Sequence, residues 1–383
     1  MDDPLLRWRD EFPILQRTAY LVSHSMGAMP RSARGWVARY LDAWEGEGVR
    51  AWEAWEPYVR EHADRIALLI GAPGGSVVLH QNVSTLFGGL LSALVRPGGR
   101  RKVVATELNF PSLLYALRGW TALGLQLHLI RCPDGATVPL DAWREAVDGH
   151  TLAVVVDHGI FRSGFLQDVE SIGELARRQG AWVVVDAYQT VGCVPFRVQD
   201  WPADAVLGGS HKWLCGGPGA AWMYVNPERA DELAPALAGW FGHRDPFAFD
   251  LELEYAPGAA RFATGTPGVA SLLAARAGLE VVLQVGVQAV RRKSQALGQR
   301  MIELADSLDL EVRSPRDPER RTGMVVVDFP GAEEAARELV RQGVLVDYRP
   351  GAGIRLSAHF YTHPHEVETA FEVLGRRVRR PVR

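Results

Sequence analysis

The chain has 383 residues, of which 47% are hydrophobic and 23% are charged, and its formal net charge is −3. This length and composition predict a large buried core and two domains, and no apolar run reaches the length of a membrane span. A net charge so close to zero argues against nucleic acid or a membrane surface as the main partner and leaves a small molecule as the expected substrate.

The first residues are acidic and lack an apolar core, so we expect no signal peptide and a cytoplasmic location. Cys132, Cys193 and Cys215 are widely spaced, which predicts neither a disulfide framework nor a metal site. The chain is therefore interpreted as a cytoplasmic protein of enzyme size without a metal.

Residues 1–30 are expected to form an irregular N-terminal segment that contains a short strand and the polar loop Ser-His-Ser-Met-Gly at 23–27. Residues 31–71 predict a helix with a kink near residues 46–48. Five aromatic side chains recur near helical spacing in this helix, which favours packing in the core or at a subunit interface. They are Trp36, Tyr40, Trp44, Trp52 and Trp55.

Strands and helices then alternate along the chain, and this spacing predicts a mostly parallel sheet covered by helices on both faces. The expected strands are 77–80, 102–106, 126–130, 152–156 and 183–186, with helices at about 112–123 and 139–148 and another ending at residue 179.

A polar turn after the first strand leads into a helix. Its free backbone N–H groups and the hydroxyls of Ser84 and Thr85 suit a phosphate group. An ordinary helix cap explains the same residues, and the two interpretations remain open. Phe110 follows the strand at 102–106, where it could stack on a planar ring at the sheet edge or simply cap the core.

Lys212 is the residue around which the functional prediction is built. It lies between Ser210-His211 and a glycine-rich loop, and a desolvated lysine amine has a lowered pKa and is nucleophilic. A surface lysine in a glycine-rich loop is the simpler alternative. Asp186, however, ends a β-branched strand at the edge where open α/β sheets bind ligands. Pyridoxal phosphate needs a lysine for a Schiff base with its aldehyde and an acid at its ring nitrogen, so the pair favours this cofactor.

The part of the chain beyond the lysine predicts a second, smaller α+β domain. A long helical stretch at about 269–307 links the two domains. We expect an N-terminal segment at 1–30, a large cofactor-binding domain at 31–270 and a small domain at 271–383. The later elements are strands at 220–225, 323–328, 344–348 and 354–357 and helices at about 332–342 and from 364.

Taken together, the chain resembles a fold-type I pyridoxal-phosphate enzyme of aminotransferase class V, and within that class it most resembles the kynureninases. The resemblance covers nearly the whole chain. Its most specific marks are residues 23–27, Asn-Phe-Pro-Ser at 109–112, Lys212 with Gly-Gly-Pro-Gly at 216–219, Gly-Trp-Phe-Gly-His at 239–243 and Gly-Thr-Pro at 265–267.

The resemblance implies a role for each matching residue. Lys212 would bind the cofactor and move protons, Asp186 would pair with the ring nitrogen, and Phe110 would stack on the ring. Arg355 would hold the substrate α-carboxylate in a bidentate grip, with Ser25 and His24 beside the substrate. The phosphate group would be held by Ser84, Thr85, Ser210 and His211, and by Trp240 and Thr266 of a neighbouring subunit in a homodimer.

Three positions depart from the kynureninase pattern. Gln189 replaces a histidine, although it is still expected near the cofactor, His211 replaces a tyrosine beside the lysine, and Leu113 replaces an aspartate. The first two positions are instead similar to those of cysteine desulfurases and related class V members.

The implied reaction is the hydrolysis of an amino acid with a γ-carbonyl, as in L-kynurenine giving anthranilate and L-alanine. His24, Tyr188 or His211 could act as acid or base, and the sequence does not choose among them. The alternative is another class V activity: an epimerase, an aminotransferase or a carbon–sulfur lyase. Cysteine desulfuration is disfavoured because no cysteine follows Cys215, and a protein that only binds would not need a buried lysine.

Overall fold

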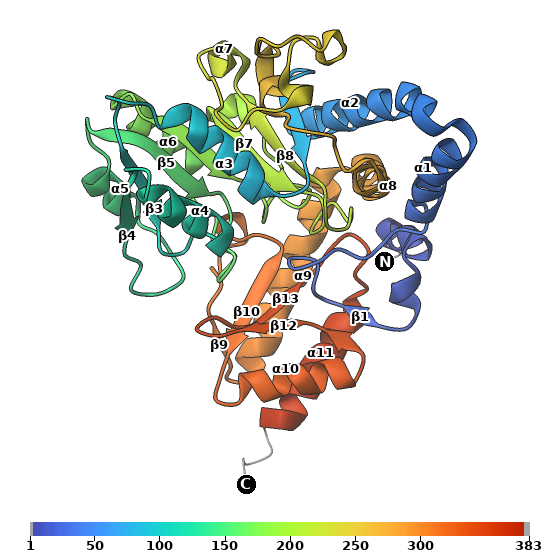
Figure 1. Cartoon of the computed structure of the whole chain (residues 1–383). Coiled ribbons are helices and arrows are strands. Elements are labelled where there is room, and N and C mark those ends of the chain that lie inside the picture. The colour runs from blue at the N-terminus through green and yellow to red at the C-terminus, as the bar shows by residue number, and fades with distance from the viewer. Residues whose placement is uncertain (1–2, 379–383) are drawn as a thin grey trace.

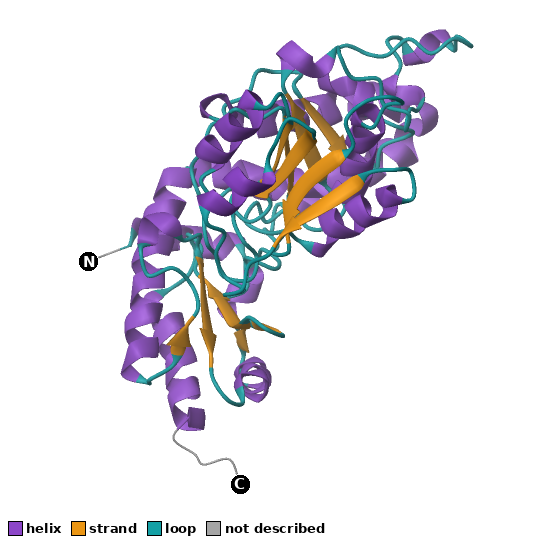
Figure 2. Cartoon of the chain, turned by 90° about the vertical axis from the view of Figure 1, so that its left-hand side faces the viewer, coloured by secondary structure: helices purple, strands orange, loops and turns teal. Residues whose placement is uncertain are grey.

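The computed structural model describes residues 3–378 and has two lobes, each built on its own sheet (Figure 1; Figure 2). The larger lobe contains a seven-stranded sheet with strand order β2-β8-β7-β6-β5-β3-β4. All neighbours pair in parallel except at β8, which is antiparallel to both β2 and β7. The strands are β2 (Val77–His80), β3 (Lys102–Thr106), β4 (Gln126–Ile130), β5 (Thr151–Asp157), β6 (Trp182–Asp186), β7 (Ala205–Gly209) and β8 (Ala221–Val225).

The central strands are buried on both faces, which explains their uninterrupted β-branched runs. On one face Val155 and Val184 pack with α3 (Val83–Leu94) and α4 (Pro111–Thr121). The opposite face, which includes Val154 and Val183, packs with side chains of α2, α5 and α6. Each fully buried valine contributes about 1.5–3 kcal/mol through the hydrophobic effect, so this sheet is the main core. These helices are α2 (Trp52–Leu69), α5 (Leu140–Ala146) and α6 (Val169–Arg178).

The kink expected near residues 46–48 separates α1 (Ala33–Glu47) from α2, with a short 3-10 turn between them. The aromatic residues of these helices pack around Trp55, together with Val269 and Leu273 of α8 (Val269–Val285). Trp44, however, is 58% exposed. Core packing is therefore found for Trp36, Tyr40, Trp52 and Trp55, whereas for Trp44 the alternative of packing at a subunit interface stays a prediction.

The smaller lobe is an antiparallel sheet with strand order β12-β13-β10-β9, packed against three helices. The N-terminal segment belongs to this lobe, because β1 (Ala19–Tyr20) pairs in parallel with β11 (Val344–Leu345) and Leu21 lies in the core. The remaining elements are β9 (Glu311–Val312), β10 (Met324–Asp328), β12 (Asp347–Arg349), β13 (Gly353–Ser357), α9 (Val287–Ser307), α10 (Ala332–Arg341) and α11 (Pro364–Val378).

Two expected elements are divided in the structure. The single strand predicted at 344–348 is two strands, because β11 pairs with β1 whereas β12 pairs with β13 of the other sheet. The helical stretch at 269–307 is broken at Gly286, whose φ of 81° favours glycine, and α8 and α9 meet there at 81°. Among residues 3–378, no single helix has the length and apolar character to cross a membrane, and α8 and α9 reach them only when counted together as one bent pair.

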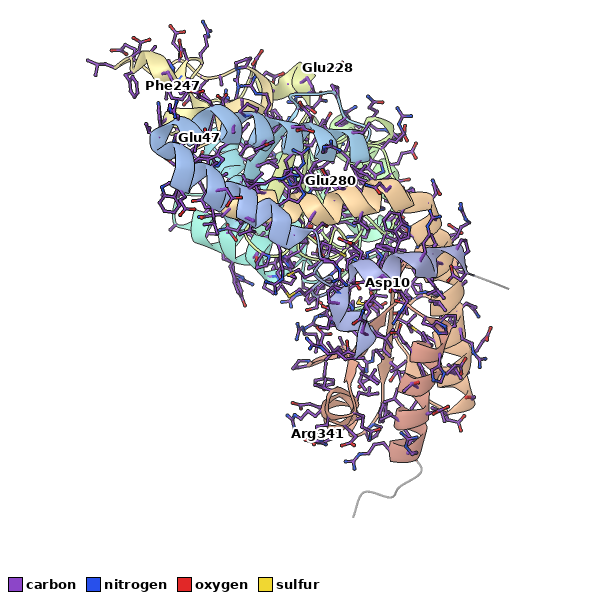
Figure 3. The ribbon with its side chains drawn as sticks, turned by 90° about the vertical axis from the view of Figure 1, so that its right-hand side faces the viewer. Asp10, Glu47, Glu228, Phe247, Glu280 and Arg341 are labelled. Carbon is purple, nitrogen blue, oxygen red and sulfur yellow. The ribbon has the colours of Figure 1, made fainter. Side chains whose placement is uncertain are left out.

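Short helices form several of the connections between the longer elements. Two of them lie in a segment at 239–255 that projects from the larger lobe (Figure 3). They are α7 (Pro227–Ala230) and the 3-10 helices at Pro4–Glu11, Pro13–Gln16, Gly48–Ala51, Val198–Asp200, Trp240–Gly242, Pro246–Ala248, Gly258–Phe262 and Pro318–Arg320.

Candidate active site

A pocket of about 180 Å³ lies at the carboxyl ends of β3, β5, β6 and β7, the edge where open α/β sheets bind ligands. Of the thirteen predicted site residues, six line this pocket, and Arg355 is among the seven that do not. Its lining is Asn82, Val83, Ser84, Phe110, Ser112, Leu113, Asp157, Gly159, Phe161, Asp186, Tyr188, Gln189, His211 and Lys212.

Lys212 is buried in this pocket, between two aromatic rings. Its Nζ lies 5.0 Å from the ring centre of Phe110 and 4.5 Å from that of Tyr188. Burial lowers the pKa of Lys212 to about 8, although Asp186 opposes the shift. About a tenth of the amine is therefore uncharged at pH 7, far more than for an ordinary lysine, and this form can attack a carbonyl carbon.

The loop after β7 holds this lysine in place through its backbone. The N–H of Gly216 donates to the carbonyl of Ser210 at 2.7 Å, and the N–H of Gly27 donates to the carbonyl of His211 at 2.8 Å. Cys215 has a φ of 53°, a left-handed conformation that is unfavourable for a residue other than glycine. The surrounding contacts hold the loop in this strained form, and the lysine position depends on both the sheet and the N-terminal segment.

Two buried carboxylates lie beside the lysine, and only one of them was predicted. Asp186 accepts the N–H of Tyr188 at 2.7 Å, and burial raises the pKa of Asp186 to about 6. Asp157 is opposite Asp186 in the parallel register and accepts the N–H of Phe110 at 3.0 Å. Burial and the charge of Asp186 raise the pKa of Asp157 above its usual value. Asp186 was predicted because it is an acid at the end of a β-branched strand. Asp157 ends β5 in the same way, so the same pattern could have identified it.

Tyr188 and His211 contact each other beside Lys212 in the pocket. The Tyr188 hydroxyl lies 2.9 Å from Nδ1 of His211. Burial raises the pKa of Tyr188 and lowers that of His211 to about 4, so both groups are uncharged at neutral pH. A β-carbon on Gly209 would overlap the Tyr188 hydroxyl, so glycine is required there for the ring to occupy this place.

The structure separates the residues expected to hold a phosphate. Ser84 lines the pocket at the start of α3, whereas Thr85 uses both its N–H and its hydroxyl on Oδ1 of Asn82, which caps the helix. The Oγ of Ser210 is buried and has no hydrogen-bond partner among the described residues. A buried hydroxyl without a partner normally costs about 1–3 kcal/mol, which indicates a group that a ligand satisfies.

These side chains fit pyridoxal phosphate. An uncharged lysine amine suits its aldehyde, Asp186 suits its ring nitrogen, and the ring of Phe110 suits a flat ring system. The orphaned hydroxyl of Ser210 and the exposed start of α3 at Ser84 suit its phosphate. The donor set is therefore what this cofactor needs.

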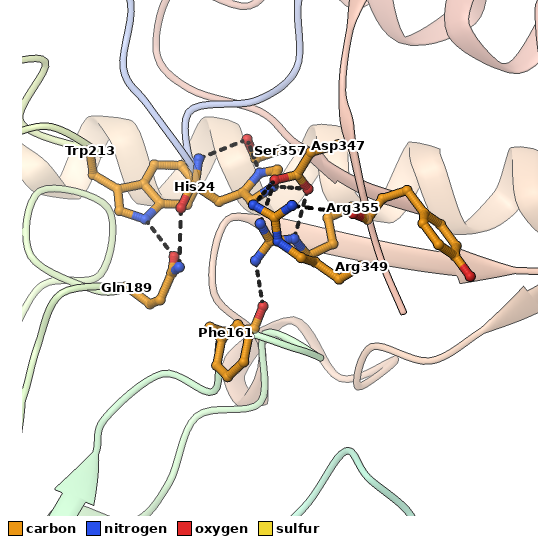
Figure 4. Close-up of polar contacts among 9 residues, drawn as sticks. His24, Phe161, Gln189, Trp213, Asp347, Arg349, Arg355 and Ser357 are labelled. Atoms are coloured by element: carbon orange, nitrogen blue, oxygen red, sulfur yellow. Dashed lines mark hydrogen bonds and ion pairs between the residues drawn. The ribbon is translucent and has the colours of Figure 1, made fainter. Parts of the chain in front are cut away.

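Arg355 lies in a polar network between the lobes (Figure 4). Its Nε donates to Asp347 at 2.7 Å, a second nitrogen donates to the other oxygen of Asp347, and Nη1 donates to the carbonyl of Phe161 at 2.8 Å. Burial raises the pKa of Asp347, but hydrogen bonds from His24 and Arg355 outweigh it and hold that pKa well below its usual value. An arginine with its Nε edge occupied in this way still has N–H groups on its outer edge for a second carboxylate.

His24 is part of the same network and is fully engaged. Its Nδ1 lies 2.9 Å from the hydroxyl of Ser357 and its Nε2 lies 3.0 Å from Asp347. Gln189 lines the pocket, but its amide donates to the carbonyl of His24 at 3.1 Å and accepts Nε1 of Trp213 at 3.4 Å. Ser25 is half-buried on the next position of the loop, outside the pocket lining. Of the three candidate acids and bases, only Tyr188 and His211 line the pocket.

Trp240 and Thr266 are not brought to Lys212 within this chain. Thr266 lines a separate cavity of about 820 Å³ between α2, β2 and the segment at 241–268. Trp240 is 39% exposed and packs on the projecting segment against Phe247 and Phe249. Figure 3 shows Phe247 near the outer end of this segment.

Comparison with known proteins identifies the family of this chain. The aminotransferase class V profile matches residues 39–367. The kynureninase of Burkholderia pseudomallei (strain 1106a) is 33% identical over 97% of this chain and 92% of its own, and that of Pseudomonas fluorescens is 30% identical over the same shares.

Among solved structures, apo cysteine desulfurase from Thermococcus onnurineus NA1 is similar, with a TM-score of 0.88, 25% identity, and coverage of 99% of this chain and 98% of its own. The cystine C-S lyase C-DES has the same fold, with a TM-score of 0.87 over 95% of this chain and 99% of its own. The expected fold-type I architecture is confirmed. The chain belongs to the aminotransferase class V family, and it is kynureninase-like over nearly its whole length.

Proposed function

We propose that this protein is a pyridoxal-phosphate-dependent hydrolase that cleaves an amino acid carrying a γ-carbonyl, with L-kynurenine giving anthranilate and L-alanine as the first candidate. The observation that carries the proposal is the buried amine of Lys212 beside Asp186 and Phe110, in a chain 33% identical to a kynureninase. Bound there, the cofactor would supply an electron sink for charge that develops on the substrate.

The residues of this chain have separate tasks in the proposal. Lys212 would hold the cofactor through its aldehyde, and the Lys212 amine would take the proton from the substrate α-carbon. Asp186 would hold the ring nitrogen, and Phe110 would cover one ring face. The outer edge of Arg355 binds the α-carboxylate, and Asp347 keeps the guanidinium plane fixed for it.

Desulfuration is a poorer fit to the same site. It requires a reactive thiolate near the substrate. Cys132, Cys193 and Cys215 are all buried, and none of them lines the pocket. Burial raises the pKa of Cys215 to about 12, so its thiol stays protonated and unreactive.

We propose further that two copies of the chain form a dimer in which Trp240 and Thr266 of one copy complete the pocket of the other. Neither residue lines the Lys212 pocket of its own chain, which supports this arrangement. The projecting segment also exposes apolar side chains that a second copy would cover. The exposed fractions are 54% for Phe247, 72% for Phe249, 101% for Leu251 and 49% for Leu253.

The dimer predicts a solution mass of two chains of 42.2 kDa each. The double substitution Phe249→Asp and Leu251→Asp is expected to shift this mass to one chain in light scattering and to weaken cofactor binding, because the second copy no longer packs there. Leu123→Asp changes another leucine that is 63% exposed and should leave both properties intact. A wild-type chain that is monomeric yet fully active would refute the dimer.

The enzymatic proposal is tested with purified protein, pyridoxal phosphate and L-kynurenine in one cuvette. We expect a visible absorption band from the bound cofactor, and anthranilate fluorescence that rises on addition of the amino acid. A band without anthranilate would move the assignment to another class V substrate. The absence of a band would refute the cofactor assignment itself.

A further inference from the structure

Tyr188 lines the pocket of Lys212, but the proposed function gives it no task. Its polar groups are already engaged. The backbone N–H donates to Asp186 at 2.7 Å, and the hydroxyl lies 2.9 Å from Nδ1 of His211. The side chain is therefore fixed at both ends, and the part that it turns toward Lys212 is the flat face of its ring.

The amine of Lys212 lies in a gap between two aromatic rings. Its Nζ is 4.5 Å from the ring centre of Tyr188 and 5.0 Å from that of Phe110. Among residues 3–378, these two rings are not in contact with one another: Phe110 contacts the ring of Phe161, and Tyr188 contacts that of His211. Stacked rings have their centres about 4.5–7 Å apart, so both faces are placed to contact a planar group joined to Nζ.

Each of the two rings is held in place by other side chains. Phe161 packs against Phe110 with the ring centres 5.2 Å apart and the ring planes at 85°. Tyr188 packs against the core on the α3 side of the sheet, which includes Val184 and Leu207. Side chains that are already ordered lose little freedom when a ligand binds, which makes them effective binding surfaces.

The place of the Tyr188 ring also depends on a residue without a side chain. Gly209 is the last residue of β7, and the loop that carries Lys212 follows it directly. A β-carbon on Gly209 would overlap both Cζ and the hydroxyl oxygen of Tyr188. The ring therefore lies beside Lys212 only because glycine leaves this space at the end of the strand.

We infer that Tyr188 is a cofactor-binding residue whose ring forms the second wall of the site, so that the ring of pyridoxal phosphate would be held between Phe110 and Tyr188. This inference rests on the proposed function. The sequence alone leaves Tyr188 as a candidate acid or base, whereas the geometry assigns its ring to contact with the cofactor. Its backbone bond to Asp186 links this wall to the acid that would hold the ring nitrogen.

The test measures the Kd of the full-length protein for pyridoxamine phosphate, which has the ring and phosphate of the cofactor but no aldehyde to react with Lys212. Tyr188→Ala should raise this Kd by about 10-fold or more, because a stacking face and its apolar contact area are lost. Tyr188→Phe keeps the ring and loses only the hydroxyl, so its Kd should stay close to the wild-type value. Tyr115→Ala removes a tyrosine that is 70% exposed on α4 and should leave the Kd unchanged.

A Tyr188→Ala protein with the wild-type Kd would overturn the inference. So would a Tyr188→Phe protein that binds as weakly as Tyr188→Ala, because the hydroxyl and not the ring would then be responsible. Should Tyr188→Ala fail to fold, Tyr188→Leu keeps apolar bulk against the core without a flat face and must also raise the Kd. A wild-type protein that binds neither pyridoxamine phosphate nor pyridoxal phosphate would instead refute the proposed function.

Discussion

Replacing Lys212 with alanine is expected to abolish the visible absorption of the protein with pyridoxal phosphate and to lower kcat by roughly 10³-fold or more. Within residues 3–378 no other amine lines the pocket, and the sequence contains only two further lysines, Lys102 and Lys293. The fold should persist, because removing a buried amine with a lowered pKa removes a desolvation cost. Absorption spectra and circular dichroism of the same sample measure both effects.

Lys102→Ala provides the control for nonspecific reaction of the cofactor aldehyde with amines. Lys102 begins β3 and pairs with Asp148 at 2.7 Å, away from the pocket lining. We expect its substitution to leave the absorption band and kcat unchanged. A Lys212→Ala protein that keeps the band would show that the cofactor binds elsewhere and would end the assignment of this lysine.

Replacing Arg355 with alanine is expected to lower kcat/KM by roughly 10²-fold or more, mainly through KM, because a charge-assisted bidentate grip on the α-carboxylate is lost. The same change removes the ion pair of Asp347, whose carboxylate is largely buried. Breaking such a pair costs about 3–5 kcal/mol, so the free energy of unfolding should fall as well. Steady-state kinetics and urea unfolding separate the two effects.

Arg349→Ala is the matched control for this prediction. Arg349 contacts the same Asp347 at 3.0 Å, but its side chain is 45% exposed and the ion pair is worth at most about 1 kcal/mol. It should therefore leave KM and stability close to the wild-type values. Equal losses in the two variants would mean that Asp347, and not a substrate carboxylate, is the functional partner of Arg355.

Much of the larger lobe could be predicted because its signals are local. Val183, Val184 and Val185 form a buried strand wherever that strand lies in the sheet, and the alternation with helices predicts parallel pairing. The smaller lobe was harder. The break between β11 and β12 arises because β11 pairs with β1 at residues 19–20. The sequence around 344–349 carries no signal of this distant pairing.

The site follows the same division. Lys212, Asp186 and Phe110 each lie at the end of a strand or in the loop beyond it, and their meeting in one pocket could be inferred from the parallel sheet. The partner of Arg355 could not be inferred, because the Asp347 contact depends on the register of β12 against β13. The Tyr188–His211 pair likewise depends on the space left by Gly209, which becomes visible only in three dimensions.

The pairing of β1 with β11 also constrains when the protein can become active during synthesis. Ala19 pairs with Val344, which is synthesised more than 300 residues later. The first strand therefore emerges from the ribosome long before its partner exists. The loop that carries His24 contacts both Lys212's loop, through Gly27, and Ser357 near the end of the chain. The loop that carries His24 therefore gains its full set of contacts only after translation has passed the last strand.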